Sequence, residues 1–413
     1  MVEPARLIAA HAAALAFYES CLARAAGPAT YLRRRGFGAL VDRAEPWHAG
    51  YAPRTWTALT EHLRERGFTT GELLTAGLVR TSQHGRTYDL FRDRIVLPIY
   101  NTRGDPIAFI GRTWRPPDPT SVHIPKYLNS PQTPLYRKGE QLFGLAQQRD
   151  RLDAGWSLVL VEGPLDAIAI WLAYSDAGST GMAALAPCGT ALTSAQVETL
   201  MALPGFGRSG IVLAYDNDEP GRTAADRAYE LLADDPSRSV RGVVLPGGTD
   251  PAGLLASPGG PARLRDLLDN HTQPQLHLAL EHRLDQMLRR SPRMLHEVEG
   301  RMAIAARLAP LIAEQPATAA VAAIRHLAAH VRIRLEEPNV GHLLGELIYS
   351  LTNAVCIYLE TSPSPSSRAR TGLPTAATGP TMRAPPTPRS ARRSGLLSGP
   401  SAIPNRPTRS ARR

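Results

Sequence analysis

Residues 157–166 read Ser-Leu-Val-Leu-Val-Glu-Gly-Pro-Leu-Asp, a short apolar run followed at once by an acid, a glycine and a proline. Four consecutive apolar residues, 158–161, are typical of a strand that is buried on both faces of a parallel sheet. Glycine and proline end the strand, and the apolar residues of 165–174 predict a helix. This strand, turn and helix determine the fold that we predict for the chain.

The same order repeats along the chain. Further strands are predicted at 183–186, 211–215 and 240–245, with helices at 194–203 and 219–232. Such alternation predicts a parallel sheet with helices on both faces. Before it, helix 5–26 precedes short helices and a β-hairpin formed by 95–99 and 107–110, and after it residues 275–360 have a helical pattern.

The charge is unevenly distributed. The net charge is +10, and the segment 361–413 carries ten Arg with no Lys and no acid, so the rest of the chain is balanced. Within that rest, 31–150 holds 18 basic and 11 acidic residues, whereas 151–360 holds 17 and 24. A basic part that grips a polyanion and an acidic part that holds divalent metal would give this pattern, as would chance.

Four domains follow: a basic α+β segment at 1–150, an α/β segment at 151–258, a helical segment at 259–360, and a Ser/Pro/Arg-rich tail at 361–413 that we expect to be disordered. The three cysteines are far apart and form no C-x-x-C pair, so neither a disulfide framework nor a cysteine zinc site is predicted. No secretory signal or apolar run long enough to span a membrane is present, and a cytoplasmic location is expected.

Acidic residues follow three of the predicted strands. Glu162 comes after the first, Asp216 and Asp218 after the third, and Asp250 after the fourth. Ligands bind at the carboxyl ends of strands in open parallel sheets, so these carboxylates should converge, with Asp166 one helical turn beyond Glu162. Clustered carboxylates repel one another unless cations neutralise them, which suits a Mg²⁺ site for phosphoryl transfer.

Four motifs in this part resemble the TOPRIM domain in its bacterial DnaG-type primase version: residues 161–166, 188–193, 215–225 and 245–251. By the resemblance, Glu162, Asp216, Asp218 and Asp250 hold Mg²⁺ or Mn²⁺, Asp166 assists, and Glu162 performs acid or base chemistry. The implied catalytic set is therefore Glu162, Asp166, Asp216 and Asp218. The implied fold is α/β with α+β, a TOPRIM parallel sheet flanked by a basic α+β N-terminal subdomain and a helical C-terminal subdomain.

Five motifs in the basic segment resemble the polymerase core of the same primases: residues 31–37, 49–53, 88–99, 108–112 and 125–145. Both lysines of the chain, Lys126 and Lys138, fall in the last of these, whereas the other 45 basic residues of the chain are all Arg. The resemblance implies that six residues contact the DNA template or the incoming nucleotide triphosphate: Arg35, Arg92, Arg112, Lys126, Asn129 and Lys138.

The chain departs from the family pattern at two places that bear on function. The family often has Asp-Pro-Asp where this chain has Asp250-Pro251-Ala252, so one potential metal ligand is missing. The family also begins with a zinc-binding domain, whereas no cysteine cluster is present here and no zinc is expected. Candidate partners are therefore a zinc-binding module in trans, the replicative helicase and single-stranded DNA.

The expected function is synthesis of short RNA primers on single-stranded DNA. Two alternatives remain open from the sequence. One is a TOPRIM nuclease, in which water attacks the phosphodiester. The other is a catalytically weak remnant that only binds single-stranded DNA, which Ala252 would favour.

Overall fold

The computed structural model describes residues 2–42, 45–116, 124–176, 178, 180–233, 239–334 and 349–357. The predicted tail at 361–413 lies outside these residues, as do 335–348 and 358–360 of the predicted helical segment. No helix in the described part is both long and apolar enough to cross a membrane.

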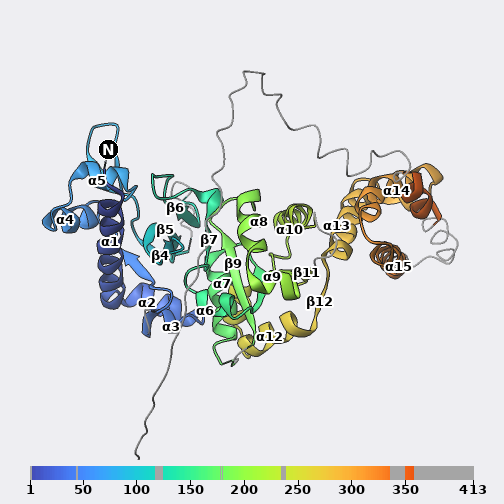
Figure 1. Ribbon diagram of the computed structural model, residues 1–413, viewed down its shortest axis with the longest axis horizontal. Helices are drawn as coiled ribbons and strands as arrows, with labels where there is room; N and C mark the ends of the chain where they lie inside the picture. The colour runs from blue at the N-terminus through green and yellow to red at the C-terminus, as the bar shows by residue number, and fades with distance from the viewer. Residues whose placement is uncertain are drawn as a thin grey trace, which may run out of the picture. The chain divides into compact units, whose positions relative to one another are not determined.

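The N-terminal part is an antiparallel sheet covered by helices (Figure 1). The strands β1 (Gly50–Ala52), β4 (Arg94–Tyr100), β5 (Pro106–Thr113) and β6 (Tyr127–Asn129) pair in the order β1-β4-β5-β6. The predicted hairpin is confirmed, because β4 pairs with β5 along its length. Helix α1 (Pro4–Arg24) lies against this sheet and packs Leu7 and Tyr18 into a core with Phe91 and Phe109.

Shorter elements complete this part. Helices α2 (Ala26–Arg34) and α3 (Ala39–Asp42) follow α1, and α4 (Ala58–Glu65) and α5 (Thr70–Thr75) precede a small hairpin of β2 (Val79–Thr81) and β3 (Thr87–Asp89). The break between α1 and α2 falls at Ala25, two residues before the predicted one, and Gly27 and Pro28 lie in the first turn of α2. A 3₁₀ turn, η1 (Lys138–Glu140), follows β6.

The second sheet has six strands in the order β12-β11-β10-β8-β9-β7. Its four central strands, β8 (Ser157–Leu160), β9 (Met182–Pro187), β10 (Ile211–Leu213) and β11 (Val240–Val243), are parallel. The edge strands β7 (Leu142–Phe143) and β12 (Thr272–Pro274) are antiparallel to their neighbours. The predicted parallel sheet is thus the centre of a mixed one.

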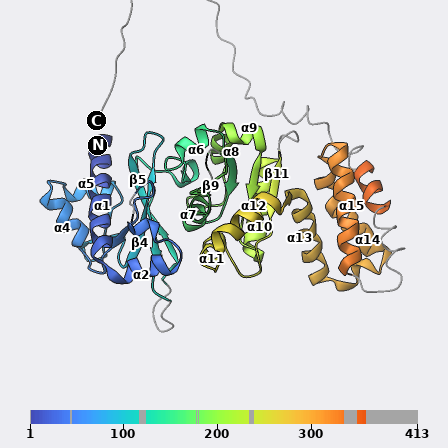
Figure 2. The same ribbon diagram turned by 90° about the horizontal axis from the view of Figure 1, so that it is seen from below.

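Helices cover both faces of this sheet (Figure 2). The chain crosses from β8 to β9 in one direction and from β9 back to β10 and β11 in the other, so right-handed crossovers place the connecting helices on opposite faces. Helix α7 (Pro164–Ala173) packs with α11 (Pro251–Leu255) and α12 (Gly260–Asn270). On the other face lie α8 (Ser194–Met201), α9 (Pro204–Ser209) and α10 (Glu219–Leu232), while α6 (Arg149–Asp153) precedes β8.

A helical region follows β12. Helix α13 (Gln275–Arg290) packs on α10 and β11, and then on α14 (Val298–Ala313) and α15 (Ala317–Arg334), with the short turn η2 (Pro292–Leu295) between α13 and α14. These elements agree with the predicted helical pattern as far as Arg334. The chain is therefore mixed α/β, with an antiparallel sheet, a mostly parallel sheet and a helical region in succession.

Candidate functional site: acidic loops of the central sheet

Three loops bring the acidic residues to one edge of the central sheet. Glu162 lies two residues after β8, Asp216 and Asp218 follow β10, and Asp250 follows β11. Because β8, β10 and β11 are parallel neighbours, their carboxyl ends meet at that edge. The prediction that helix geometry joins Glu162 to Asp166 is wrong, since α7 starts at Pro164 and Glu162 lies before it.

Two of these acids also cap helices. Asp218 is the N-cap of α10 and its Oδ1 accepts a hydrogen bond from the Gly221 amide at 2.8 Å. Asp250 is the N-cap of α11 and accepts in the same way from the Gly253 amide. Each cap satisfies an otherwise unpaired helical N–H, and the positive end of each helix dipole faces a carboxylate.

Gly221 allows α10 to approach two of the acids. A Cβ atom at this position would lie 2.2 Å from the Asp216 carbonyl oxygen and 2.6 Å from Glu162 Oε1. Glu162 Oε1 in turn accepts a hydrogen bond from the Asp216 amide at 3.2 Å. The absence of a side chain at Gly221 thus keeps the loops after β8 and β10 together.

The carboxyl groups raise one another's pKa. The carboxyl of Glu162 remains solvent accessible, yet partial desolvation and the charges of Asp216 and Asp218 raise its pKa to about 7. Desolvation and the charges of Asp250 and Asp218 raise the pKa of Asp216 to about 6. Perturbed carboxylates gathered at a ligand-binding edge are typical of a functional site.

Asp166 lies beneath this group. It is only 7% exposed, and burial together with the charge of Asp250 raises its pKa to about 7. Its Oδ1 accepts a hydrogen bond from the backbone amide of Ala252 at 3.1 Å. Ala252 is 2% exposed, so the residue that departs from the family pattern belongs to the packed floor of the site.

No three acidic, histidine or cysteine side chains among the described residues are arranged to hold a metal ion together. Asp218, Asp250 and Asp166 each direct an oxygen to a backbone amide, and Glu162 does the same. The donor set still suits a hard divalent cation, because it consists of carboxylate oxygens whose mutual repulsion such a cation would relieve.

One cation and one phenol face the acids from the N-terminal part. The charge of Lys126 lowers the pKa of Glu162, Asp166 and Asp216, which opposes their mutual repulsion. The Tyr127 hydroxyl would lie 3.6 Å from a Cβ at Gly163, and burial raises its pKa. Arg112 is 5% exposed and donates to the hydroxyls of Tyr127 and Tyr31.

Asn129 and Lys138 approach the neighbouring loop, which follows β9. Asn129 Nδ2 lies 2.1 Å from where a Cβ of Gly189 would be, and Gly189 has a φ of +72°. The Gln196 side chain donates to the backbone carbonyl of Lys138 at 3.2 Å. Burial raises the pKa of Cys188 to about 12, and Lys138 lowers it in part. Strand β6 therefore places Tyr127 beside the acids and Asn129 beside the next loop, and Lys126 directly precedes the strand.

Two predicted residues show no contact with the acidic loops in the described part. Arg92 lies over the rings of Trp56 and Tyr88, at 4.2 and 5.1 Å from their centroids, and donates to the Asp89 carbonyl oxygen. Arg35 is the C-cap of α2, and its neighbour Gly36 packs against Leu255 of α11, the helix that Asp250 caps.

Several contributors were not singled out from the sequence. Tyr31 and Tyr127 lie inside motifs that carry the resemblance, but the motifs do not indicate that Arg112 donates hydrogen bonds to their hydroxyls. Gly189 and Gly221 are also inside motifs, and their role becomes visible only when the opposing side chains, Asn129 and Glu162, are in place.

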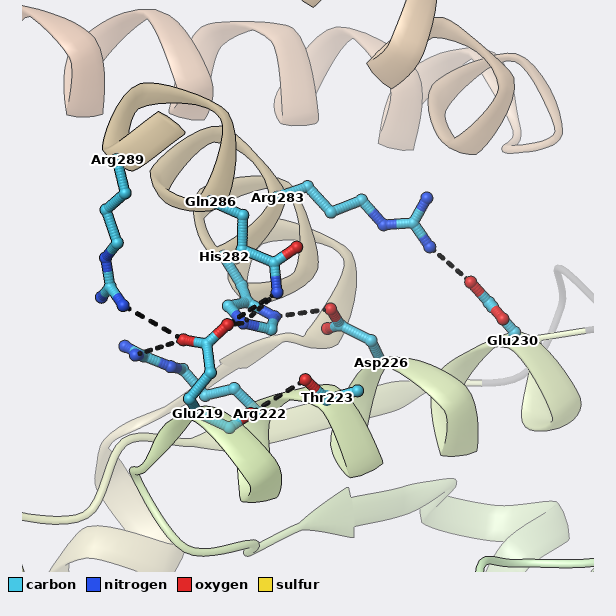
Figure 3. Close-up of polar contacts among 9 residues, drawn as sticks. All are labelled: Glu219, Arg222, Thr223, Asp226, Glu230, His282, Arg283, Gln286 and Arg289. Carbon is cyan, nitrogen blue, oxygen red and sulfur yellow. Dashed lines mark hydrogen bonds and ion pairs between the residues drawn. The ribbon is translucent and has the colours of Figure 1, made fainter. Parts of the chain in front are cut away.

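Helix α10 is held from its far side by α13 (Figure 3). The His282 ring is 3% exposed and lies between two carboxylates, with Nδ1 2.7 Å from Asp226 and Nε2 3.1 Å from Glu219. Gln286 donates to Glu219, and Arg289 and Arg222 pair with it. Glu219 directly follows Asp218, so this network fixes the first turn of the helix that Asp218 caps.

Two family models match the chain. The DNA primase catalytic core, N-terminal domain, matches residues 17–149, and a Toprim-like domain matches 159–255. The DNA primase of Mycobacterium tuberculosis is 35% identical over 318 residues, covering 75% of this chain and 46% of that protein. The DNA primase of Pseudomonas aeruginosa is 34% identical over 362 residues, covering 86% and 48%. The chain thus spans about half the length of these relatives.

Solved structures give the same result. The RNA polymerase domain of Mycobacterium tuberculosis primase DnaG is 32% identical, with a TM-score of 0.65, and the match covers 80% of this chain and all of that domain. A DnaG primase catalytic domain bound to single-stranded DNA is 30% identical, with a TM-score of 0.60 and coverage of 79% and 95%. The chain therefore belongs to the family of DnaG-type primase catalytic cores with a Toprim domain.

Proposed function

We propose that this chain synthesises short RNA primers on a single-stranded DNA template. The observation that supports it best is the group of repelling carboxylates on three neighbouring strand ends, with Lys126 facing them, in a chain of the primase family. The reaction would be attack of a 3′-hydroxyl on the α-phosphate of a nucleotide triphosphate, with pyrophosphate as the leaving group. Catalysis of this kind consists mainly of positioning and charge stabilisation.

Glu162, Asp216, Asp218 and Asp250 would hold Mg²⁺ or Mn²⁺, and Asp166 would support them from beneath. When bound, the cations would lower the pKa of the attacking hydroxyl and neutralise charge on the phosphates. Glu162 would take or return a proton near neutral pH, because its pKa is about 7. The Ala252 amide holds Asp166, so its carboxylate stays directed toward the loop of Asp250.

The N-terminal part would bind the nucleic acid and the nucleotide. Lys126 and Lys138 would act as point charges for phosphates, and Arg112 would act by orienting Tyr127. Asn129 would bind the substrate at the loop after β9, and Arg35 and Arg92 would contact the template strand. One related domain is described in complex with single-stranded DNA, which supports this assignment.

In this proposal, segment 1–150 binds the substrates, segment 151–258 carries the catalytic residues, and segment 259–360 supports the catalytic segment. A zinc-binding module in trans and the replicative helicase are the proposed protein partners. Neither is required for the first test, because the reaction can be measured on a short template with a preannealed primer.

The test is synthesis of labelled RNA on single-stranded DNA with nucleotide triphosphates and Mg²⁺ or Mn²⁺. The native chain is compared with Asp216→Asn/Asp218→Asn, and with Glu198→Gln as a control on an exposed acid of α8. We expect product from the native chain and the control only, and addition of a zinc-binding module should raise the yield of unprimed synthesis.

Two results would contradict the proposal. Cleavage of DNA without nucleotides, lost in the Asp216→Asn/Asp218→Asn variant, would identify a nuclease. Binding of single-stranded DNA with no synthesis under any condition would identify a binding protein.

Titration of Mn²⁺, followed by its paramagnetic signal, provides a readout of the carboxylates that is independent of activity.

A further inference from the structure

A pocket of about 480 Å³ lies between α10, α13 and α14, apart from the acidic loops. Four arginines line it, the half-buried Arg283 and the exposed Arg227, Arg290 and Arg307. None of these residues belongs to the proposed catalytic or template-binding set. The pocket is therefore distinct from the proposed polymerase site.

Two of the three helices that bound it, α10 and α13, turn polar faces toward each other. Thr223, Asp226, Arg227 and Glu230 lie on one face of α10, since they are spaced at i, i+3, i+4 and i+7. The lining residues of α13, from Arg283 to Arg290, have the same spacing. Packed helices normally meet through apolar faces, and α13 has such a face at Leu276, Leu280 and Leu284.

The acids in the pocket are already engaged (Figure 3). Asp226 accepts from His282 at 2.7 Å, and Glu230 pairs with Arg283. The lining therefore contains four arginines against two carboxylates, of which Asp226 is hydrogen-bonded to His282 and Glu230 is paired with Arg283. The charge that remains is positive, and it favours an anion with several oxygen acceptors.

One wall of the pocket is apolar. Met287 and Met294 are half-buried and line the cavity beside Ala303. Thioether side chains adapt their shape and make favourable contacts with aromatic rings. A volume of about 480 Å³ is in the range of small-molecule sites, and three helices bound it.

We propose that this pocket binds a free nucleotide with two or more phosphate groups. The guanidinium groups bind the phosphates and the methionines contact the base. The phosphodiester backbone of a nucleic acid has related chemistry, but the limited volume and the methionine wall favour the small molecule. The site is separate from the catalytic one, so it is independent of whether primers are made.

The test is calorimetric titration of the full chain with ATP and, separately, with tripolyphosphate, in the absence of divalent cations. Arg290→Ala/Arg307→Ala should weaken the binding of both by about ten- to a hundredfold, since two charge-assisted contacts are lost. Arg293→Ala, an exposed arginine outside the pocket, should bind as the native chain does. Lys126→Ala/Lys138→Ala, at the proposed catalytic site, should retain this binding event.

Three results would overturn the proposal. The first is equal affinity of Arg290→Ala/Arg307→Ala and Arg293→Ala for ATP, and the second is loss of ATP binding in Lys126→Ala/Lys138→Ala alone. The third is that an oligodeoxynucleotide binds at the pocket whereas ATP and tripolyphosphate do not. If the double alanine variant fails to fold, Arg290→Lys/Arg307→Lys replaces it. That variant keeps the charge and loses the planar fork, and weaker binding is still expected.

Discussion

Two clusters of charged residues flank α10, and they show opposite electrostatics. At its first turn, Glu162 and Asp216 repel each other and have raised pKa values, about 7 and about 6. One residue beyond Asp218, Glu219 has its pKa lowered to about 2, because Gln286 and His282 donate hydrogen bonds to it. The same residue types thus occupy an unbalanced cluster and a balanced one within a few residues.

This difference in electrostatics is what we expect between the proposed catalytic cluster and a network that supports the fold. The network around His282 and Glu219 holds α13 on α10 through contacts within the protein, and it does not include Arg227, Arg290 and Arg307 of the neighbouring pocket. Like charges that no neighbour balances store electrostatic repulsion, and the only cation that opposes them across the site is Lys126, among the residues described. Such unbalanced groups are expected where a cation or substrate completes the arrangement.

The largest effect is expected in the unbalanced cluster. Glu162→Gln should reduce primer synthesis by at least about a hundredfold, because it removes the group proposed to move a proton. Thermal stability should stay the same or rise, since one repelling charge is gone. Synthesis assays and melting curves check both, with Glu198→Gln as the control. If Glu162→Gln lost activity because it unfolded, Glu162 would support the fold as His282 does, and the proposed difference between the two clusters would be wrong.

Removal of His282 should have the opposite outcome. His282→Ala leaves Asp226 buried without its partner and should destabilise the fold by about 3 kcal/mol. Denaturant unfolding measures this, with His271→Ala as an exposed control. Combining His282→Ala with Asp226→Asn should restore part of the loss, and purely additive effects would argue against a shared network.

The acidic cluster should make the stability of the chain depend on pH. Glu162 and Asp166 have pKa values near 7 when folded, against 4.5 and 3.8 as ordinary values. The folded chain then holds more protons than the unfolded chain over this range, so without divalent cations stability should fall as pH rises from about 4 to about 7.

Mg²⁺ or Mn²⁺ should reverse this loss, by about 2.7 kcal/mol at a hundredfold excess over Kd. Melting curves across this pH range, with and without the cation, provide the measurement. Asp216→Asn/Asp218→Asn should abolish the cation effect while His282→Ala leaves it intact. An equal cation effect in all three chains would place the cation elsewhere.

The smallest effect is expected at the rim of the balanced network. Arg289 is 59% exposed and its partner Glu219 43%, so Arg289→Ala should change the free energy of unfolding by less than about 1 kcal/mol. The pKa of Glu219 should stay low, because Gln286 and His282 contribute more to it. Carboxyl NMR titration measures this, and a return of Glu219 to its ordinary pKa would assign the effect to Arg289 instead.

Much of the fold could be predicted from local pattern. The four central strands and helices α7, α8 and α10 follow from apolar runs and from their end residues, and their parallel order places the acids together. The edge strands β7 and β12 could not be predicted in this way, because they are two and three residues long and one ends in Pro274. Their strand character comes from pairing with a neighbour.

The site was predictable in its acids and less so in its supports. Acids placed after strands converge through topology alone, whereas the contact of His282 with Glu219 spans 63 residues of sequence. Nothing local in a helix indicates which distant helix its histidine faces. The same holds for Arg112, which an arginine-rich motif suggests as a phosphate ligand and which the fold directs at two tyrosines.

Gly221 has a consequence for the tolerance of this chain to mutation. Any side chain there would meet both the Asp216 backbone and the Glu162 carboxylate. A saturation library should therefore be depleted of every replacement at this position, as strongly as at the acids themselves. Replacements of Gly221 should therefore be selected against, although this residue contributes no reactive atom to the site.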